Sequence, residues 1–340
     1  MVSTRLGLFS HLDEPGPAGE VYRRAVELFA YAERLGVDTA WVAVRHFHSG
    51  LAGLPSGLVF LAALAARTER IGLGTAVVPL AFENPIRLAE DAAVLDAVSG
   101  GRVELGVGKG LGMGLSTETF AAFGVDDRER ERRYVEALTA LRRTLDGEAL
   151  TEAGSSLHPP APGLTGRIWQ ATGSLATTVA VAEAGDALQV HRGVPGATDS
   201  GAVQAEQIRV YLRAYRGPRP PRVGISRGIV PAESREHALD LIRASLRANA
   251  VRQGRLAELA ELDSLAEVAA VAERLNTKYG TVDQVVEQLA ADPAVALATD
   301  LIVGFTPAVP TFEQARDLVE VVATRIAPAL GWRRQTALVG

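Results

Sequence analysis

The sequence contains no cysteine, few aromatic residues and no excess of basic charge. The lack of cysteine excludes disulfides, thiolate metal sites and a cysteine nucleophile. The net charge is −5 at pH 7 and the two signs are mixed along the chain, which provides neither a basic face for nucleic acid nor a polybasic patch for an anionic membrane. No apolar run reaches the length of a membrane span and the N-terminus has no signal-peptide pattern, so we expect a cytoplasmic protein.

The composition is that of a globular protein with a large core. The chain has 340 residues, of which 47% are hydrophobic and 22% are charged. This length fits either one large α/β domain or two smaller ones. No linker-like stretch divides the chain, so we expect a single domain over residues 1–340.

Short apolar strands alternate along the chain with amphipathic helices, several of which end at a glycine. The predicted strands are 5–9, 39–44, 71–78, a fourth beginning at 102, 167–171, 187–190, 222–230 and 300–305. The predicted helices are 21–35, one beginning near 56, 86–98, 126–145, 175–184, about 202–215 and 312–330. The helix at 86–98 is apolar almost all round, which predicts that it is covered on more than one side.

Two segments do not fit this alternation. Residues 148–166 are rich in proline and glycine, and we expect them to form an excursion or a hairpin. Residues 233–298, before the last strand, are expected to be mostly helical, with a break at NTKYGT. The polar stretch 276–280 in this break is either a lid over the active site or a simple turn between two helices.

Eight strands that alternate with helices predict parallel pairing through right-handed crossovers, and closure of such a sheet gives a (β/α)₈ TIM barrel. The alternative is an open doubly wound sheet. It fits less well, because no glycine fingerprint follows the first strand. A barrel places its functional residues at the C-terminal ends of the strands. We therefore looked for reactive side chains at those ends.

The second predicted strand is followed by a basic and aromatic cluster that includes Arg45, His46 and His48. A single histidine is more often structural than catalytic. Its position at the catalytic rim of a barrel favours a functional role, and imidazole is suited to acid–base chemistry near neutral pH.

The fourth predicted strand ends in a glycine-rich stretch around one cation, Gly108-Lys109-Gly110. Glycines allow backbone N–H groups to approach a phosphate closely, and the ammonium adds a positive charge. The chain has two lysines against thirty-three arginines, so a lysine here is distinctive. The alternative is an ordinary glycine-rich connection with a solvated lysine.

The fifth predicted strand ends in Thr172-Gly173-Ser174, and a helix with Thr177 in its first turn follows at once. The N-terminus of a helix binds anions through its unpaired N–H groups, and nearby hydroxyls complete such a site. Ser174 is also a good N-cap whatever its function. Arg192, at the end of the sixth strand, either supplies a further charge to this site or is a solvated rim residue.

Three stretches of the sequence resemble the bacterial luciferase-like flavin-dependent monooxygenases. DTAWVAVRHF resembles the second strand and histidine motif of that family, and IWQATGSLATT resembles its flavin-phosphate turn. The most specific match is LGTAVVPLAFENPIRLAEDAAVLDAVSGGRVELGVGKG, which resembles the third strand, third helix and fourth strand. The resemblance extends nearly from end to end and is weakest in 148–166 and 231–299.

The resemblance implies that Lys109, Ser174 and Thr177 bind the phosphate of a flavin. It also implies that Ala76-Val77 forms a bulged, non-prolyl cis peptide against the isoalloxazine ring. The predicted cofactor-binding residues are Gly74, Thr75, Ala76, Val77, Gly108, Lys109, Thr172, Gly173, Ser174, Thr177 and Arg192.

The chain departs from the family at one catalytic position. The family commonly has two adjacent histidines, the first of which acts in acid–base catalysis, and here Arg45 takes the first place. An arginine cannot be a general base, although it can bind an anionic substrate or stabilise an anion. His46, in the second place, is therefore the predicted residue for proton transfer.

The function that the resemblance implies is oxygenation of an aldehyde, ketone or sulfonate by reduced FMN and dioxygen, with the FMN supplied by a separate reductase. The alternatives are hydride transfer with a deazaflavin on the same fold and a catalytically idle flavin-binding protein. A metal-dependent hydrolase ranks last, because histidines and carboxylates do not cluster at strand ends in ligand spacing. The apolar helix 86–98 predicts a homodimer face, as in the resembled family.

Overall fold

The computed structural model describes residues 4–47, 53–110, 114–194, 196–197, 199–252 and 255–332, and only the backbone at 114–116. Its strands are β1 Arg5–Ser10, β2 Thr39–Val42, β3 Gly72–Thr75, β4 Val78–Pro79, β5 Val103–Gly108, β6 Ile168–Thr172, β7 Ala187–Val190, β8 Val223–Pro231, β9 Thr277–Gly280 and β10 Asp300–Gly304. Its longer helices are α1 Ala18–Arg34, α2 Gly57–Ala65, α3 Pro85–Ser99, α4 Gly114–Ala122, α5 Arg130–Leu145, α6 Leu175–Glu183, α7 Ser200–Ala214, α8 Arg235–Arg252, α9 Leu265–Arg274, α10 Val282–Ala290 and α11 Phe312–Val321.

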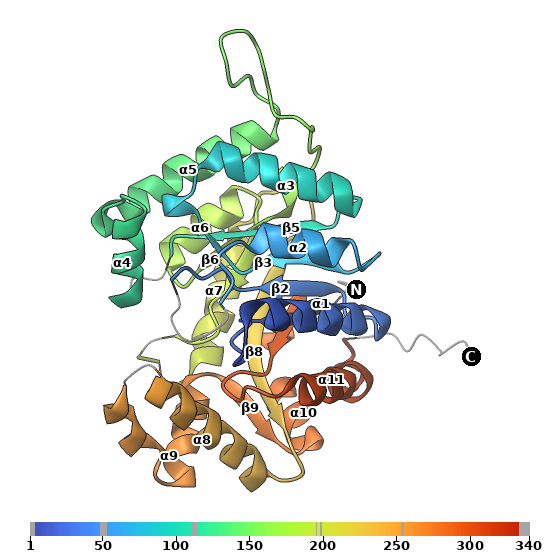
Figure 1. The fold of residues 1–340 in the computed structure, drawn as a ribbon, viewed down its shortest axis with the longest axis vertical. Helices are drawn as coiled ribbons and strands as arrows, with labels where there is room; N and C mark the ends of the chain where they lie inside the picture. Colours follow the sequence, from blue (N-terminus) through green and yellow to red (C-terminus); the bar gives the residue numbers. More distant parts are fainter. Residues whose placement is uncertain are drawn as a thin grey trace, which may run out of the picture.

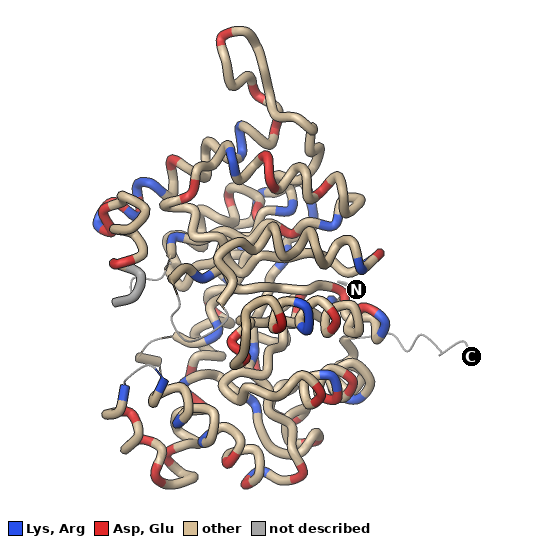
Figure 2. The backbone as a smooth tube through the Cα atoms, viewed as in Figure 1, with Lys and Arg blue, Asp and Glu red and all other residues tan. Residues whose placement is uncertain are grey.

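The strands form a closed parallel barrel with helices around it (Figure 1). The sheet runs β1, β2, β3, β5, β6, β7, β8 and β10, and β10 then pairs with both β8 and β1. This closure confirms the predicted (β/α)₈ barrel and excludes the open sheet. Acidic and basic residues are interspersed along outer helices such as α5 and α11 (Figure 2). None of the helices in the described ranges is long and apolar enough to cross a membrane.

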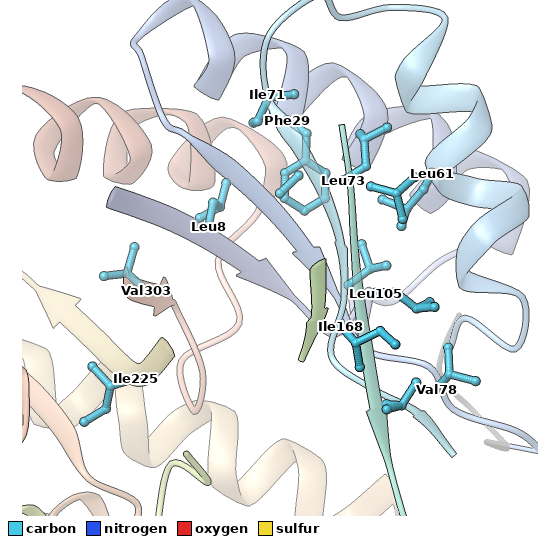
Figure 3. Close-up of a cluster of buried hydrophobic side chains, with 14 of the residues drawn as sticks. Leu8, Phe29, Leu61, Ile71, Leu73, Val78, Leu105, Ile168, Ile225 and Val303 are labelled. Carbon is cyan, nitrogen blue, oxygen red and sulfur yellow. The ribbon is translucent and has the colours of Figure 1, made fainter. Parts of the chain in front are cut away.

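The main core lies between the ring of strands and the ring of helices. Phe29 of α1 and Leu61 of α2 are fully buried beside Leu73 of β3 (Figure 3). The apolar stripe on α1 explains its position, because Val21, Ala25, Leu28 and Phe29 recur at helical spacing and are all buried. The buried face of α1 therefore packs toward the ring of strands.

Two tryptophans fill the interior of the barrel. Trp41 of β2 and Trp169 of β6 come from opposite sides of the ring of strands, yet their ring centroids are 5.2 Å apart in an edge-to-face arrangement. Glycine is required opposite them, since a Cβ at Gly74 would lie 2.3 Å from the Trp41 ring. This layer closes the barrel below the C-terminal ends of the strands.

The N-terminal end of the barrel is closed by a paired cluster of charges. Glu104 of β5 accepts hydrogen bonds from Arg5 and Arg222, each at 2.9 Å, and from the Trp169 indole at 2.8 Å. Arg222 also donates to Asp300 at 2.8 Å. Every charge in this cluster therefore faces one of opposite sign.

The predicted strand 71–78 is interrupted at a bulge between β3 and β4. The Ala76–Val77 peptide is cis, as the family resemblance implies. Leu73 pairs with Val103 but Val78 pairs with Val107, so the register slips by one residue across the bulge.

The segment 148–166 is an excursion, as predicted, and extends away from the barrel beyond the end of α5 (Figure 1). Its turn is closed by a hydrogen bond from the Leu150 amide to the Ser155 carbonyl at 2.7 Å. No strand forms within it, so it is not a β-hairpin.

The long insertion between β8 and β10 is mostly helical, as predicted, but the interpretation of 276–280 as a lid or a turn is wrong. These residues include β9, which pairs in parallel with the end of β8 from Gly228–Thr277 to Pro231–Gly280. Tyr279 is 1% exposed. A buried ion pair between Lys278 and Asp292, at 2.9 Å, holds the strand in place. A strand that is fixed in this way cannot act as a mobile lid.

Candidate functional site

A cavity of about 690 Å³ opens at the C-terminal ends of the barrel strands. Its wall combines apolar residues with a few polar groups, which is typical of a small-molecule site. The residues that line the cavity include His11 and Asp13 after β1, Arg45 and His46 after β2, Ala76 and Val77 at the bulge, Phe82, Phe120, Arg192 after β7, Asn249 and Arg252 of α8, and Thr306 after β10.

The structure brings Lys109 and Thr177 together. Lys109 follows β5 directly, and its Nζ donates to the Thr177 Oγ1 at 3.1 Å. The two residues come from adjacent loops because β5 and β6 are paired neighbours in the barrel. The Lys109 side chain is 21% exposed. An anion placed here would meet an ammonium and a hydroxyl at once.

Ser174 is the N-cap of α6 and therefore has a structural role at the start of this helix. Its Oγ accepts from the Thr177 amide at a long 3.5 Å, while the Thr172 Oγ1 accepts from the Ser174 amide at 3.0 Å. Thr172 is buried, and with Gly173 it shapes the turn that presents the helix end. Thr177 is the third residue of α6, so its hydroxyl lies in the same first turn as the N–H groups that can bind an anion.

Glu131 is a member of this site that the sequence did not reveal. It lies in the first turn of α5, and its Oε1 accepts from the Lys109 Nζ at 2.5 Å. The run RERERR in which it occurs looks like an ordinary solvated helix start, so no local signal pointed to Lys109. Its side chain, which is 67% exposed, places a carboxylate directly against the Lys109 ammonium.

Ala76 and Val77 line the cavity, whereas the other predicted residues around them shape the bulge. A Cβ at Gly108 would lie 2.7 Å from Val77 Cγ2, so only glycine leaves room for the bulge. Thr75 is fully buried and donates to the Gly106 carbonyl at 2.8 Å. Gly74 packs against Trp41 in the layer beneath.

His46 lies among phenylalanine rings at the edge of the cavity. Its ring makes edge-to-face contacts with Phe82 and Phe123, at centroid distances of 5.3 and 5.1 Å. Within the part of the chain that the structure describes, its buried Nε2 has no hydrogen-bond partner. Burial lowers the pKa of His46 below the ordinary 6.5. A neutral imidazole with a free ring nitrogen is able to exchange a proton with a ligand. His48 lies outside the described residues.

Arg45 and Arg192 bring positive charge to the cavity. Arg45 forms an ion pair with Asp13 at 3.3 Å. Arg192 donates to the Thr306 Oγ1 at 2.6 Å and lies half-buried in the cavity wall, so it is not a solvated rim residue. The sequence allowed Arg192 to supply a further charge to the phosphate site. Among the described residues, however, its hydrogen bonds go to Thr306 and not to Lys109 or Thr177. Burial, assisted by Arg227 and Arg45, lowers the pKa of Arg192 to about 10.

Comparison with known proteins identifies relatives for nearly the whole chain. A family model described as luciferase-like monooxygenase matches residues 4–300. The chain is 32% identical over 251 residues to an uncharacterized protein, y4wF, of Sinorhizobium fredii, with 69% of each protein covered. It is 32% identical over 170 residues to an F420-dependent glucose-6-phosphate dehydrogenase of Nocardia farcinica, which covers 46% of this chain and 48% of that protein.

Two solved structures have the same fold. The monooxygenase RslO1 of Streptomyces bottropensis matches with a TM-score of 0.72 and 25% identity, and the match covers 96% of this chain and 99% of that one. The oxygenating constituent of 3,6-diketocamphane monooxygenase of Pseudomonas putida, solved with FMN, has a TM-score of 0.72 at 16% identity. That match covers 96% of this chain and 98% of the other, and at such identity it shows the fold alone.

Proposed function

Because the chain belongs to the luciferase-like monooxygenase family, a family of oxidoreductases, we propose that it binds reduced FMN and uses dioxygen to oxygenate a small organic substrate. The observation that carries the proposal is the 3.1 Å contact between Lys109 and Thr177 at the N-terminus of α6. Substrates of the aldehyde, ketone or sulfonate class fit this activity. A separate reductase, in contact only transiently, is the proposed source of the reduced flavin.

The donor set at Lys109 suits a phosphate. An ammonium, a hydroxyl and the N–H groups at the start of α6 are the groups that bind phosphates in proteins. The carboxylate of Glu131 already accepts from the ammonium, which is direct support for attraction of an anion to this point. In the proposal, Lys109, Thr177 and Ser174 hold the flavin phosphate, and Glu131 moves aside.

The wall of the cavity suits a flat aromatic ring. Ala76, Val77 and Phe82 line it with apolar atoms, and Phe82 stacks on Phe123 at a centroid distance of 4.6 Å. These side chains would exclude water from a flavin ring bound against them. FMN, when bound, supplies the electrons and activates dioxygen.

His46 and Arg45 are the residues that we assign to the chemistry on the protein side. His46 holds or delivers a proton at Nε2, which has no protein partner among the described residues. Arg45 is held by Asp13 and presents a permanent positive charge at the same rim. A cation in that place stabilises negative charge in the cavity, whereas it cannot remove a proton.

Hydride transfer with a deazaflavin is the second candidate, because one relative named above is an F420-dependent dehydrogenase. The same phosphate site serves either cofactor. An idle flavin-binding protein is the third possibility that an experiment has to separate.

The experiment is a titration of the purified protein with FMN and with F420, followed by oxygen-uptake measurements with chemically reduced FMN and a panel of aldehydes, ketones and sulfonates. FMN binding with substrate-dependent oxygen uptake is the expected result. Binding of F420 alone, with hydride transfer and no oxygen uptake, would support the second candidate. Flavin binding with no turnover of any kind would leave an idle protein.

We also propose that the chain forms a homodimer through the outer faces of α2 and α3. Helix α3 packs against both α2 and α5 and is thus covered on more than one side, as predicted, but Val94 and Val98 on its outer face are 50% and 66% exposed. Val59 on the neighbouring α2 is 70% exposed. Light scattering should show a dimer that Val98→Glu converts to a monomer, because the charge would be buried at the interface. A monomeric wild-type protein would reject the proposal.

A further inference from the structure

Arg192 has no carboxylate within ion-pair distance among the residues that the structure describes. Within the described ranges, its guanidinium donates hydrogen bonds to the hydroxyl and the carbonyl oxygen of Thr306, at 2.6 and 3.3 Å. The charged groups that act on it are two further cations, Arg45 and Arg227. A half-buried cation beside other cations is unfavourable unless a ligand supplies the missing negative charge.

Arg227, on the adjacent strand β8, shows how this fold treats an internal arginine that serves structure alone. It is fully buried and forms a bidentate pair with Asp292, at 2.9 Å from Nε and 3.1 Å from Nη2. Arg227 therefore has an acid as its partner, whereas Arg192 has none among the described residues, and Arg192 is also the less enclosed of the two. Arg192 faces the cavity, and Arg227 faces its own carboxylate.

The charges that line the cavity do not balance. Arg45 is paired with Asp13, and Arg255 is paired with Glu258 at 2.7 Å. Arg192 and Arg252 have no such partner within the described ranges, so the lining carries an excess of positive charge. The polar groups beside them include Asn249 on α8 and Thr306 after β10. This arrangement selects a ligand with one anionic end.

The geometry points to an organic oxyanion, a carboxylate or a sulfonate, as the substrate class, with Arg192 as its anchor at the β7 side of the cavity. A planar guanidinium donates two parallel hydrogen bonds to such a group. His46 follows β2, which lies across the ring of strands from β7, so the uncharged end of the ligand is directed toward His46 and the space beside the proposed flavin ring. That this ligand is the substrate rests on the proposed function, whereas the anion site itself does not.

The test compares anions with neutral molecules of the same shape. Calorimetry of the full-length protein, without FMN and loaded with FMN, is performed with acetate, benzoate, octanoate and benzenesulfonate against the matching amides. We expect at least one carboxylate or sulfonate to bind about 10- to 100-fold more tightly than its amide, as a charge-assisted hydrogen bond is gained. A stronger preference for sulfonate over carboxylate, or the reverse, identifies the head group.

Three variants test which residue causes the preference for anions over amides. Arg192→Gln should abolish it, Arg192→Lys should retain part of it as a point charge, and Arg252→Gln, at the rim, should leave most of it. If Arg192→Gln does not fold, Thr306→Val serves in its place, since it removes the hydroxyl that orients Arg192 and should reduce the preference. Equal binding of anions and amides by the wild type, or an undiminished preference in the folded Arg192 and Thr306 variants, overturns the inference. An anion preference without FMN binding would instead refute the proposed function and leave the anion site standing.

Discussion

Both ends of the barrel contain buried charged or titratable side chains, but the two ends differ in whether these side chains have partners. At the N-terminal end, Glu104 is enclosed by Arg5, Arg222 and the indole of Trp169, and every charge has a partner. At the C-terminal end, Arg192 has only the oxygens of Thr306, and the Nε2 of His46 has no partner in the described part of the chain. The polar groups at the N-terminal end therefore have their partners without a ligand, whereas those at the C-terminal end do not.

The pKa shifts follow this difference. Burial alone would raise the pKa of Glu104, but Arg222 and Arg5 hold it below its ordinary value. Burial lowers the pKa of Arg192 and of His46, and no neighbouring acid reverses that effect. The lesson is that buried charge marks a functional site only where the chain leaves it uncompensated.

The largest effect in this comparison should come from Glu104→Ala. The change leaves Arg222 and Arg5 without an acceptor inside the barrel and should cost about 3–5 kcal/mol of unfolding free energy. Urea denaturation measures the loss. Arg192→Gln is the matched change at the other end, and it should cost less than about 1 kcal/mol because no ion pair is broken. Equal losses would mean that the two ends do not differ as described.

His46→Ala should come next, with turnover reduced about 100-fold and FMN affinity changed little, because a positioned proton donor or acceptor typically contributes that much. Steady-state rates and a flavin titration on the same preparation separate the two effects. A parallel loss of turnover and affinity would make His46 a structural residue.

The pH dependence gives an independent check on His46. Burial lowers its pKa, so the neutral imidazole persists below the ordinary value of 6.5 and is lost only at more acidic pH. The acid limb of the wild-type turnover profile should therefore lie below pH 6.5 and should be missing in the residual activity of His46→Ala. An acid limb that is unchanged in the variant would belong to another group.

The smallest effect is expected from Glu131→Gln. The substitution removes an exposed carboxylate that competes for Lys109, so FMN should bind about three- to fivefold more tightly, or roughly 0.5–1 kcal/mol. The gain should shrink as salt is added, because exposed charges are screened. Weaker binding in the variant would show that Glu131 contacts the ligand instead of competing with it.

The sequence predicted those parts of the site that follow strands directly. Lys109 and Thr177 come together because neighbouring parallel strands end at the same edge of the barrel, and this is a rule of topology. The pairing of Glu131 with Lys109, and of Thr306 with Arg192, depends on how distant elements pack. No spacing in the sequence encodes such contacts.

Strand β9, Thr277–Gly280, was missed for a similar reason. Asn276 and Gly280 are typical turn residues, and the stretch between them is too short to show a period. The strand pairs with the end of β8, and Lys278 within it forms an ion pair with Asp292, which is also the partner of Arg227. Such tertiary ion pairs override local preference.

The central claim is that Lys109 and Thr177 hold the phosphate of FMN, and the most direct measurement compares the affinities of FMN and riboflavin for the wild type and for Lys109→Ala. Riboflavin has the same ring without the phosphate, so it isolates the contribution of this site. Lys109→Ala should weaken FMN binding by about 1–3 kcal/mol, roughly 5- to 150-fold, and should leave riboflavin binding unchanged. An unchanged FMN affinity, or equal losses for the two flavins, would contradict the central claim.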